Sequence, residues 1–310
     1  MDNDRKKIYL MICNQSTNLK QQDWLEQMPE LNILADVKPV LIFNQPSADI
    51  TPKIWLKLAK EIQQRFNQTD GFVILHSVDN LLYTSCALSF LLQNLTKPIV
   101  FTGVQSNKPS VKKTEIRANL INSYQAVNHQ IAGVSVMFGN RLIKANQALK
   151  SNTEGSLNVF ATPINVPSLL GRIDFSIRTF SKTGSAKEKT KFYTSLAEKV
   201  EVITVGPLIN LKKIANQIEG CEGIAVNAEA YQNLPTDLIE LLGKSGLPIV
   251  IWSKNISNPE FLPKNILLIN SMTWPSALTK FLWVLTQTKN NKGIKELMNK
   301  NIAGEIIHQN

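Results

Sequence analysis

Short apolar runs alternate with helical patterns through the first half of the chain. Runs typical of buried strands occur at residues 8–12, 39–43, 72–75, 99–102 and 134–138, and apolar residues at helical spacing cover residues 51–66 and 81–95. Strands that alternate with helices are typical of a parallel sheet with helices packed on its faces. The pattern therefore predicts a mostly parallel, doubly wound α/β sheet.

A second, smaller group of alternating elements follows a polar segment. Residues 181–191 are rich in Lys, Ser, Thr and Gly and have no apolar period, which is typical of a linker. Beyond it, strand-like runs occur at 200–205, 223–226 and 248–252, and helical patterns at 208–218, 237–244 and 274–286. A chain of 310 residues is near the size at which single cores divide. We therefore expect an N-terminal α/β domain at 1–180, a linker at 181–199 and a smaller C-terminal α/β domain at 200–310.

One polar residue interrupts the apolar segment GFVILHSVDNLLYTSCALSFLL, residues 71–92. Asp79 lies in the turn at 76–80, between a predicted strand and a predicted helix. Ligands of open α/β sheets bind at the carboxyl ends of strands, which makes Asp79 a candidate binding residue. Asp is also a common cap of the helix that follows such a turn, so a purely structural role is the alternative interpretation.

Composition and charge exclude several classes of protein. Hydrophobic residues make up 43% of the chain and charged residues 19%, and no stretch approaches 18 uninterrupted apolar residues. The N-terminal segment lacks the features of a secretory signal, so we expect a cytoplasmic protein without a membrane partner. The formal charge is +10, yet the Lys-rich segments 182–191 and 289–301 contain no aromatic residue. They are typical of a solvated connection and a solvated terminal helix, so we expect no nucleic-acid partner. The positive net charge favours the binding of small acidic ligands.

The sequence contains no motif for a disulfide framework, a metal or a dinucleotide. Its cysteines, at positions 13, 86 and 221, are odd in number and widely spaced, and its histidines, at 76, 129 and 308, are too far apart to suggest a ligand cluster. No G-x-G-x-x-G motif follows a predicted strand. We therefore expect reduced cysteines, no metal and no cofactor.

Four segments in the right order resemble the bacterial cytoplasmic (type I) L-asparaginases, and the resemblance covers nearly the whole chain. The segments are PSADITPKIW (46–55), DGFVILHSVDNLL and its continuation (70–105), RLIKANQALKS and its continuation (141–173), and SMTWPSALTKFLWVL (271–285). Asp79 matches the second aspartate of the family's D-G-hydrophobic-H-G-T-D-T block, and Lys150 matches the family's catalytic lysine. Ser47 matches a serine that contacts the substrate.

The resemblance implies hydrolysis of the side-chain amide of L-asparagine to aspartate and ammonia. Amide hydrolysis without a metal needs an oxygen nucleophile, a proton relay and donors for the oxyanion. The family's nucleophilic threonine aligns with Ser16, and Thr17 is a competitor one residue away. Asp79 and Lys150 would form the relay. The resemblance also implies a homodimer or homotetramer in which the partner's C-terminal domain completes each site, with asparagine or aspartate as ligand.

Several positions depart from the family pattern. The family's catalytic threonine before the aspartate is Val78 here, and the glycine before that threonine is Ser77. A valine neither donates nor accepts a proton, and Ser77 or Asn80 would have to replace it. The chain between residues 16 and 47 is shorter than in the family and contains no tyrosine, so we expect the family's mobile lid to be absent. Three functions remain: an asparaginase, an amidase with an altered relay, and a catalytically inactive member that serves as a small-ligand sensor or dimeric scaffold.

Overall fold

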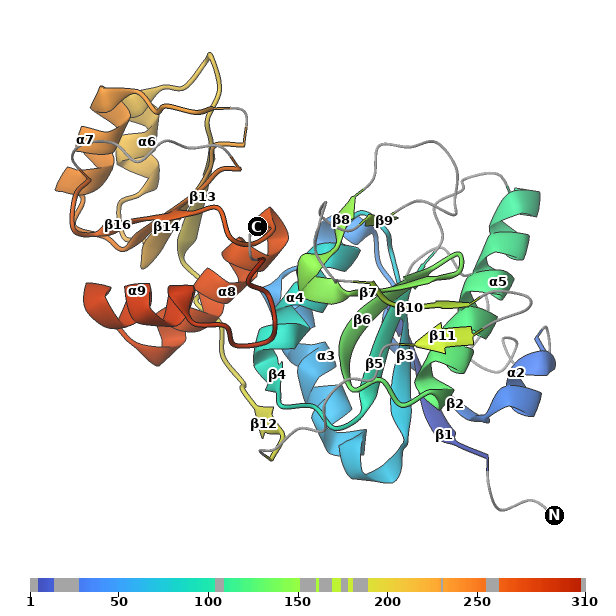
Figure 1. Ribbon diagram of the computed structural model, residues 1–310. Helices are drawn as coiled ribbons and strands as arrows, with labels where there is room; N and C mark the ends of the chain where they lie inside the picture. The colour runs from blue at the N-terminus through green and yellow to red at the C-terminus, as the bar shows by residue number, and fades with distance from the viewer. Residues whose placement is uncertain are drawn as a thin grey trace. The chain divides into compact units, whose positions relative to one another are not determined.

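The computed structural model describes residues 5–13, 28–103, 109–150, 160–161, 169–173, 178–180, 189–229, 231–254 and 262–307 (Figure 1). The chain forms two compact units that divide between Thr194 and Ser195. This division falls inside the range 181–199 that the sequence predicted as a linker. Each unit is an α/β structure with its own sheet, as the alternation of strands and helices predicted.

The first unit contains an eight-stranded sheet in the order β11-β10-β7-β6-β5-β3-β1-β2. Its parallel strands are β2 (Asp36–Phe43), β1 (Lys7–Cys13), β3 (Gly71–His76), β5 (Pro98–Thr102) and β6 (Gly133–Phe138). Three antiparallel strands extend the sheet beyond β6, namely β7 (Arg141–Lys144), β10 (Leu169–Ile173) and β11 (Arg178–Phe180). The parallel part confirms the predicted doubly wound sheet, and the antiparallel extension was not predicted.

Helices cover both faces of this sheet (Figure 1). One face packs against α2 (Glu30–Leu34) and α5 (Pro109–Asn128), and the other carries α3 (Pro52–Arg65) and α4 (Leu81–Leu91). Short elements complete the unit: η1 (Ser47–Asp49), η2 (Phe66–Gln68), η3 (Ala145–Gln147), β4 (Leu92–Gln93), β8 (Leu149–Lys150), β9 (Phe160–Ala161) and β12 (Lys191–Phe192). Every residue of β3 is buried, which explains why it reads as a continuous apolar run rather than an alternating one.

The second unit contains four parallel strands in sequence order. They are β13 (Val200–Thr204), β14 (Gly223–Asn227), β15 (Ile249–Trp252) and β16 (Ile266–Ile269). The helices α6 (Leu211–Gln217) and α7 (Thr236–Lys244) share an apolar core with one face of this sheet, and α8 (Trp274–Gln287) packs on β14 and β15, with α9 (Asn291–Asn299) against α8. No helix in the described ranges is long and apolar enough to cross a membrane.

The last helix differs from the expected solvated element. A helix does form within residues 289–301, but Ile294 and Met298 of α9 are buried, with 3% and 0% of their surfaces exposed. Lysines and asparagines dominate the sequence there and conceal two apolar positions four residues apart. Such a pair lies on one face of a helix, which is the face that packs on α8.

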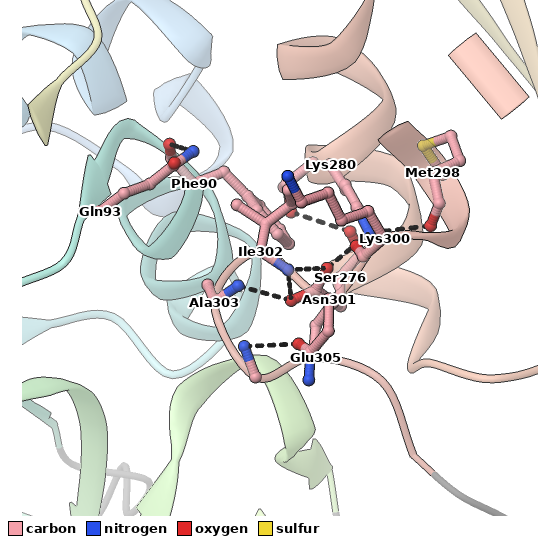
Figure 2. A network of polar contacts seen from close by, with 12 residues as sticks. Phe90, Gln93, Ser276, Lys280, Met298, Lys300, Asn301, Ile302, Ala303 and Glu305 are labelled. Atoms are coloured by element: carbon pink, nitrogen blue, oxygen red, sulfur yellow. Dashed lines mark hydrogen bonds and ion pairs between the residues drawn. The ribbon is translucent and has the colours of Figure 1, made fainter. Parts of the chain in front are cut away.

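A buried ion pair joins α8 to the chain that follows α9. The side chains of Lys280 and Glu305 are fully buried, and their charged atoms lie 2.5 Å apart (Figure 2). The Lys280 ammonium also donates to the carbonyl oxygens of Met298 at 2.8 Å and Lys300 at 2.6 Å. Burial lowers the pKa of Lys280, and the facing carboxylate opposes that shift.

The Glu305 carboxylate is satisfied by backbone donors as well as by the ammonium. It accepts from the N–H groups of Ile302 at 3.1 Å and Ala303 at 2.7 Å (Figure 2). Ile307 N–H then donates to the carbonyl of Ser271, in the loop before α8. The segment 300–307 is thus fastened to α8 by charge-assisted hydrogen bonds at a dry site, where such bonds are strong and an unpaired charge is costly.

Removal of one member of this pair is expected to destabilise the protein strongly. Lys280→Met or Glu305→Gln should each lower the free energy of unfolding by about 3–5 kcal/mol, because the remaining polar group stays buried without its partner. The double variant Lys280→Met/Glu305→Leu should cost less than the sum of the two. Lys244→Met is the control, because Lys244 pairs with Glu240 while 78% exposed, and should cost at most about 0.5 kcal/mol. Urea denaturation measures all four, and an equal cost for Lys280→Met and Lys244→Met would contradict the account.

Candidate active site

The order in which the chain adds strands to the sheet reverses beside β1. The chain passes from β1 to β2 on one side and then crosses to β3 on the other. Cys13, the last residue of β1, pairs with Phe43 of β2 and with His76 of β3, so the three strands end side by side. In open α/β sheets, the crevice outside such strand ends is where ligands bind. The residues that follow the three strand ends are therefore the candidates for the site.

Side chains after β2 and after β3 meet at this end of the sheet. The hydroxyl of Ser47, in η1, donates to Oδ2 of Asp79 at 2.9 Å. The hydroxyl of Ser77 approaches the same oxygen at 3.4 Å. In the opposite direction, Nδ2 of Asn80 donates to the carbonyl of Ser47 at 2.6 Å. The two segments are thus joined by reciprocal hydrogen bonds, and the side chains of Ser47, Ser77 and Asp79 form one cluster.

The carboxylate of Asp79 does not serve as the cap of α4. The N-cap residue is Asn80, whose side chain accepts no hydrogen bond from the helix. The helix-cap interpretation is therefore wrong for Asp79. Its side chain is exposed and turned toward Ser47. A carboxylate has room for about four hydrogen bonds, so two hydroxyl donors leave acceptor capacity for a ligand.

Val78 lies in the same turn and is anchored in the protein interior. Only 8% of its surface is exposed. A Cβ placed on Gly103, directly after β5, would lie 3.3 Å from Val78 Cγ2, so this methyl group faces the Gly103 backbone. Valine and threonine have nearly the same shape, so a threonine would fit here at the cost of desolvating its hydroxyl.

His76, at the end of β3, supports the turn from inside the sheet. The ring is fully buried, and its Nδ1 lies 2.7 Å from the carbonyl oxygen of Ser77. Because a carbonyl only accepts, Nδ1 carries the proton and donates. Burial lowers the pKa of His76 to about 4, and the bond to Ser77 opposes that shift. The imidazole is therefore neutral at pH 7. Among the atoms that the structure describes, its Nε2 has no hydrogen-bond partner.

The remaining predicted residues are placed less completely. Lys150 ends the two-residue strand β8, and its side chain is exposed. It follows η3, which packs against α4, with the Cys86 thiol 3.6 Å from the Ala145 carbonyl. Lys150 and Asp79 are both exposed, so they do not form a buried ion pair. Ser16 and Thr17 lie outside the described residues.

A metal centre is not formed by the part of the chain that the structure describes. There, no three His, Cys, Asp or Glu side chains converge closely enough to hold an ion. The buried thiol of Cys13, beside His76, is held protonated because burial raises its pKa to about 12. The chemistry available at this end of the sheet is that of hydroxyl, carboxylate and amide groups.

Comparison with known proteins places this arrangement in a family. A model described as "Asparaginase, N-terminal" matches residues 13–183. The chain belongs to the asparaginase family. The matched range includes every candidate site residue, namely Ser16, Ser47, Ser77, Val78, Asp79 and Lys150.

Relatives of this asparaginase-family chain carry two different names. L-asparaginase 1 of Escherichia coli K12 is 29% identical over 279 residues, which cover 84% of this chain and 81% of that protein. A subunit of the glutamyl-tRNA(Gln) amidotransferase of Pyrococcus abyssi is 28% identical over 312 residues, covering 92% of this chain and 70% of that protein. Among solved structures, L-asparaginase I of Vibrio cholerae matches with a TM-score of 0.81 and 25% identity, over 98% of this chain and all of that chain. The comparisons establish the asparaginase family and its fold, and they leave the type I subclass open.

The buried His76 should make stability fall as the pH is lowered. Its pKa drops from 6.5 to about 4 on folding, so between these values the unfolded chain binds a proton that the folded protein does not. The free energy of unfolding should therefore decrease by about 3 kcal/mol from pH 6.5 to pH 4 on account of this residue. His76→Gln, which keeps an N–H donor, should remove that part of the decrease. Identical pH dependence of the two proteins in urea denaturation would show that His76 is not the cause.

Proposed function

We propose that the protein hydrolyses the side-chain amide of L-asparagine, giving aspartate and ammonia. The observation that carries the proposal is the hydrogen bond between Ser47 and Asp79 at the switch point of the sheet, in a chain of the asparaginase family. An amino-acid substrate presents an ammonium, a carboxylate and an amide within a few bonds of one another. The cluster offers an acceptor for the ammonium and a hydroxyl donor for the carboxylate.

In this proposal Asp79 and Ser47 bind the amino-acid end of the substrate. An exposed carboxylate binds an ammonium by a charge-assisted hydrogen bond, which is about twice as strong as a neutral one. Ser47 is free to rotate its hydroxyl from Asp79 to the substrate's carboxylate, because a hydroxyl donates in whichever direction suits it. The Asn80 side chain donates to the Ser47 carbonyl and so holds the Ser47 backbone in place. The Ser47 hydroxyl therefore stays near Asp79 during this exchange.

The nucleophile is assigned to Ser16, with Thr17 as the competing hydroxyl. Ser16 follows Cys13 by three residues, as Asp79 follows His76 by three, and Cys13 and His76 pair in register. The argument for Ser16 is one of sequence position, because the same three-residue separation follows the paired ends of β1 and β3. A serine hydroxyl becomes nucleophilic only when a base removes its proton. In this proposal Lys150 and Asp79 supply the base and the proton relay.

Val78 limits the path that a proton relay can take. A buried methyl group passes no proton, so the relay must bypass this residue if the protein turns over its substrate. Ser77 is the candidate replacement, because its hydroxyl already lies 3.4 Å from Asp79. The name of the Pyrococcus relative indicates amide chemistry on a glutamyl group, which makes L-glutamine the second substrate to test.

Ammonia release decides between turnover and an inactive binding protein. Purified protein should release ammonia from L-asparagine, and Asp79→Ala should lower kcat/KM about 1000-fold, because the carboxylate both binds the substrate and relays the proton. Val78→Thr should raise kcat about 10-fold or more by restoring a hydroxyl. Asp49→Ala is the matched control, since Asp49 is an exposed aspartate two residues after Ser47, and should leave kcat/KM unchanged.

The outcome that contradicts turnover is the absence of ammonia release from L-asparagine and L-glutamine by the unmodified protein and by Val78→Thr. That result would favour the alternative of an inactive member that binds a small ligand or serves as a dimeric scaffold. Loss of activity in Asp49→Ala equal to that in Asp79→Ala would show that the carboxylate of Asp79 has no special role.

A homodimer or homotetramer is part of the same proposal. It follows from the family resemblance, in which the partner's C-terminal domain completes the site. Light scattering should give a mass of at least twice the 34.7 kDa of one chain. A strict monomer that releases ammonia would contradict the shared site and leave the hydrolysis itself intact.

A further inference from the structure

Gly103 makes a close contact with the turn that carries Asp79. It follows β5, the neighbour of β3, and a Cβ added there would lie only 2.4 Å from the carbonyl oxygen of His76. Contacts of real Cβ atoms at that distance are essentially absent from proteins. The obstacle is backbone, which cannot swing aside as a long side chain does. Any residue larger than glycine must therefore displace the start of the turn.

A buried asparagine fixes Gly103 in this position. Asn119, on α5, has 2% of its surface exposed. Its Nδ2 donates to the carbonyl of Gly103 at 2.8 Å, and its Oδ1 accepts from the N–H of Gly139 at 3.0 Å. Gly139 lies in the tight turn between β6 and β7, at a φ of 57°. One amide side chain thus connects α5, the end of β5 and the β6–β7 turn.

The turn at residues 77–80 is consequently held from two directions. On one side Ser47 and Asn80 join it to η1, which follows β2. On the other side it packs against Gly103, which Asn119 holds. The side chain of Val78 faces Gly103, whereas that of its neighbour Asp79 faces Ser47. A shift of the Gly103 backbone would therefore displace Val78. Because Asp79 is the next residue, its carboxylate would change direction.

We propose that Gly103 and Asn119 are positioning residues for substrate binding, which act by fixing the turn that carries Asp79. Neither residue contacts the cluster of Ser47 and Asp79 through its own side chain. The expected effect on kcat/KM rests on the proposed function. The effect on the geometry of the turn does not, because that geometry is measurable whether or not the protein is an enzyme. A misplacement of about 1 Å at such a site lowers rates by about 100-fold.

Two variants test the two contacts separately. Gly103→Ala introduces the Cβ that collides with the His76 carbonyl. Asn119→Asp keeps an acceptor for the Gly139 N–H, but it replaces the donor to Gly103 with a carboxylate oxygen that repels the carbonyl. In each variant we expect faster hydrogen–deuterium exchange in the peptide that covers residues 76–81. We also expect at least 10-fold weaker binding of L-aspartate by calorimetry and about 100-fold lower kcat/KM for L-asparagine.

Matched controls separate positioning from general loss of stability. Gly71→Ala places a Cβ 2.6 Å from Val127 at the opposite end of the same strand β3. Ser123→Ala removes a buried hydroxyl that donates to the Asn119 carbonyl, one helical turn further along α5. Both controls should lower the melting temperature, and both should leave exchange at residues 76–81 and aspartate affinity within about 3-fold of the unmodified protein.

The results distinguish failure of this inference from failure of the proposed function. If exchange at residues 76–81 is the same in Gly103→Ala and Asn119→Asp as in the two controls, the positioning role is wrong. The proposed function fails if the unmodified protein neither binds aspartate nor releases ammonia. The positioning of the turn still stands in that case if hydrogen–deuterium exchange at residues 76–81 rises only in Gly103→Ala and Asn119→Asp. Equal loss of aspartate binding in all four variants would contradict the inference, because it would indicate general destabilisation.

Discussion

The pairing of β1 with β2 on one side and with β3 on the other is the constraint on which the candidate site depends. It aligns Phe43, Cys13 and His76 at one edge of the sheet, so η1, which follows β2, and the turn after β3 leave the sheet at the same end. A register slip of one residue in β1 would exchange its two faces and place buried side chains against the wrong helices. The apolar residues of β1, β2 and β3 therefore fix the place where Ser47 and Asp79 meet.

The turn after β3 combines a buried anchor with an exposed functional group. Val78 packs inward against Gly103, and Asp79, the next residue, is exposed and hydrogen-bonded to Ser47. His76 secures the first peptide of the turn from within the core through the Ser77 carbonyl. The carboxylate is held by neutral hydroxyls rather than by a buried cation. It can therefore exchange a hydroxyl for a ligand's ammonium without leaving a charge unpaired in the interior.

Sequence reasoning recovered the elements whose signal is local. The parallel strands of the eight-stranded sheet were found because each is a short apolar run, and α3, α4, α6, α7 and α8 because their apolar residues recur at helical spacing. The strand β16 was not predicted, although its residues also form such a run. The helix α5 was missed because its apolar positions have little periodicity, and β7, β10 and β11 because each is a short run that contains an arginine. The buried pair of Lys280 and Glu305 joins residues with no sequence signal in common, so only the folded chain reveals it.

The candidate site was predictable only in part, because its contacts join segments that are far apart in the sequence. Asp79 is conspicuous as a polar break, and the family resemblance singled out Ser47, but their hydrogen bond requires the pairing of β1 with both neighbours. The support from Gly103 and Asn119 depends on contacts across three elements that the sequence does not specify. Reasoning about the turn alone offered a helix cap as the alternative role of Asp79, and the geometry shows that Asn80 occupies that position.

The central claim is that the cluster of Ser47 and Asp79 binds the amino-acid end of a ligand. A crystal structure of the protein with saturating L-aspartate tests it most directly. We predict aspartate at the carboxyl ends of β1 and β3, with the Asp79 carboxylate bonded to its ammonium and the Ser47 hydroxyl turned from Asp79 to the ligand. An empty site in which the Ser47 hydroxyl still donates to Asp79 would contradict this claim and leave only the fold of the asparaginase family.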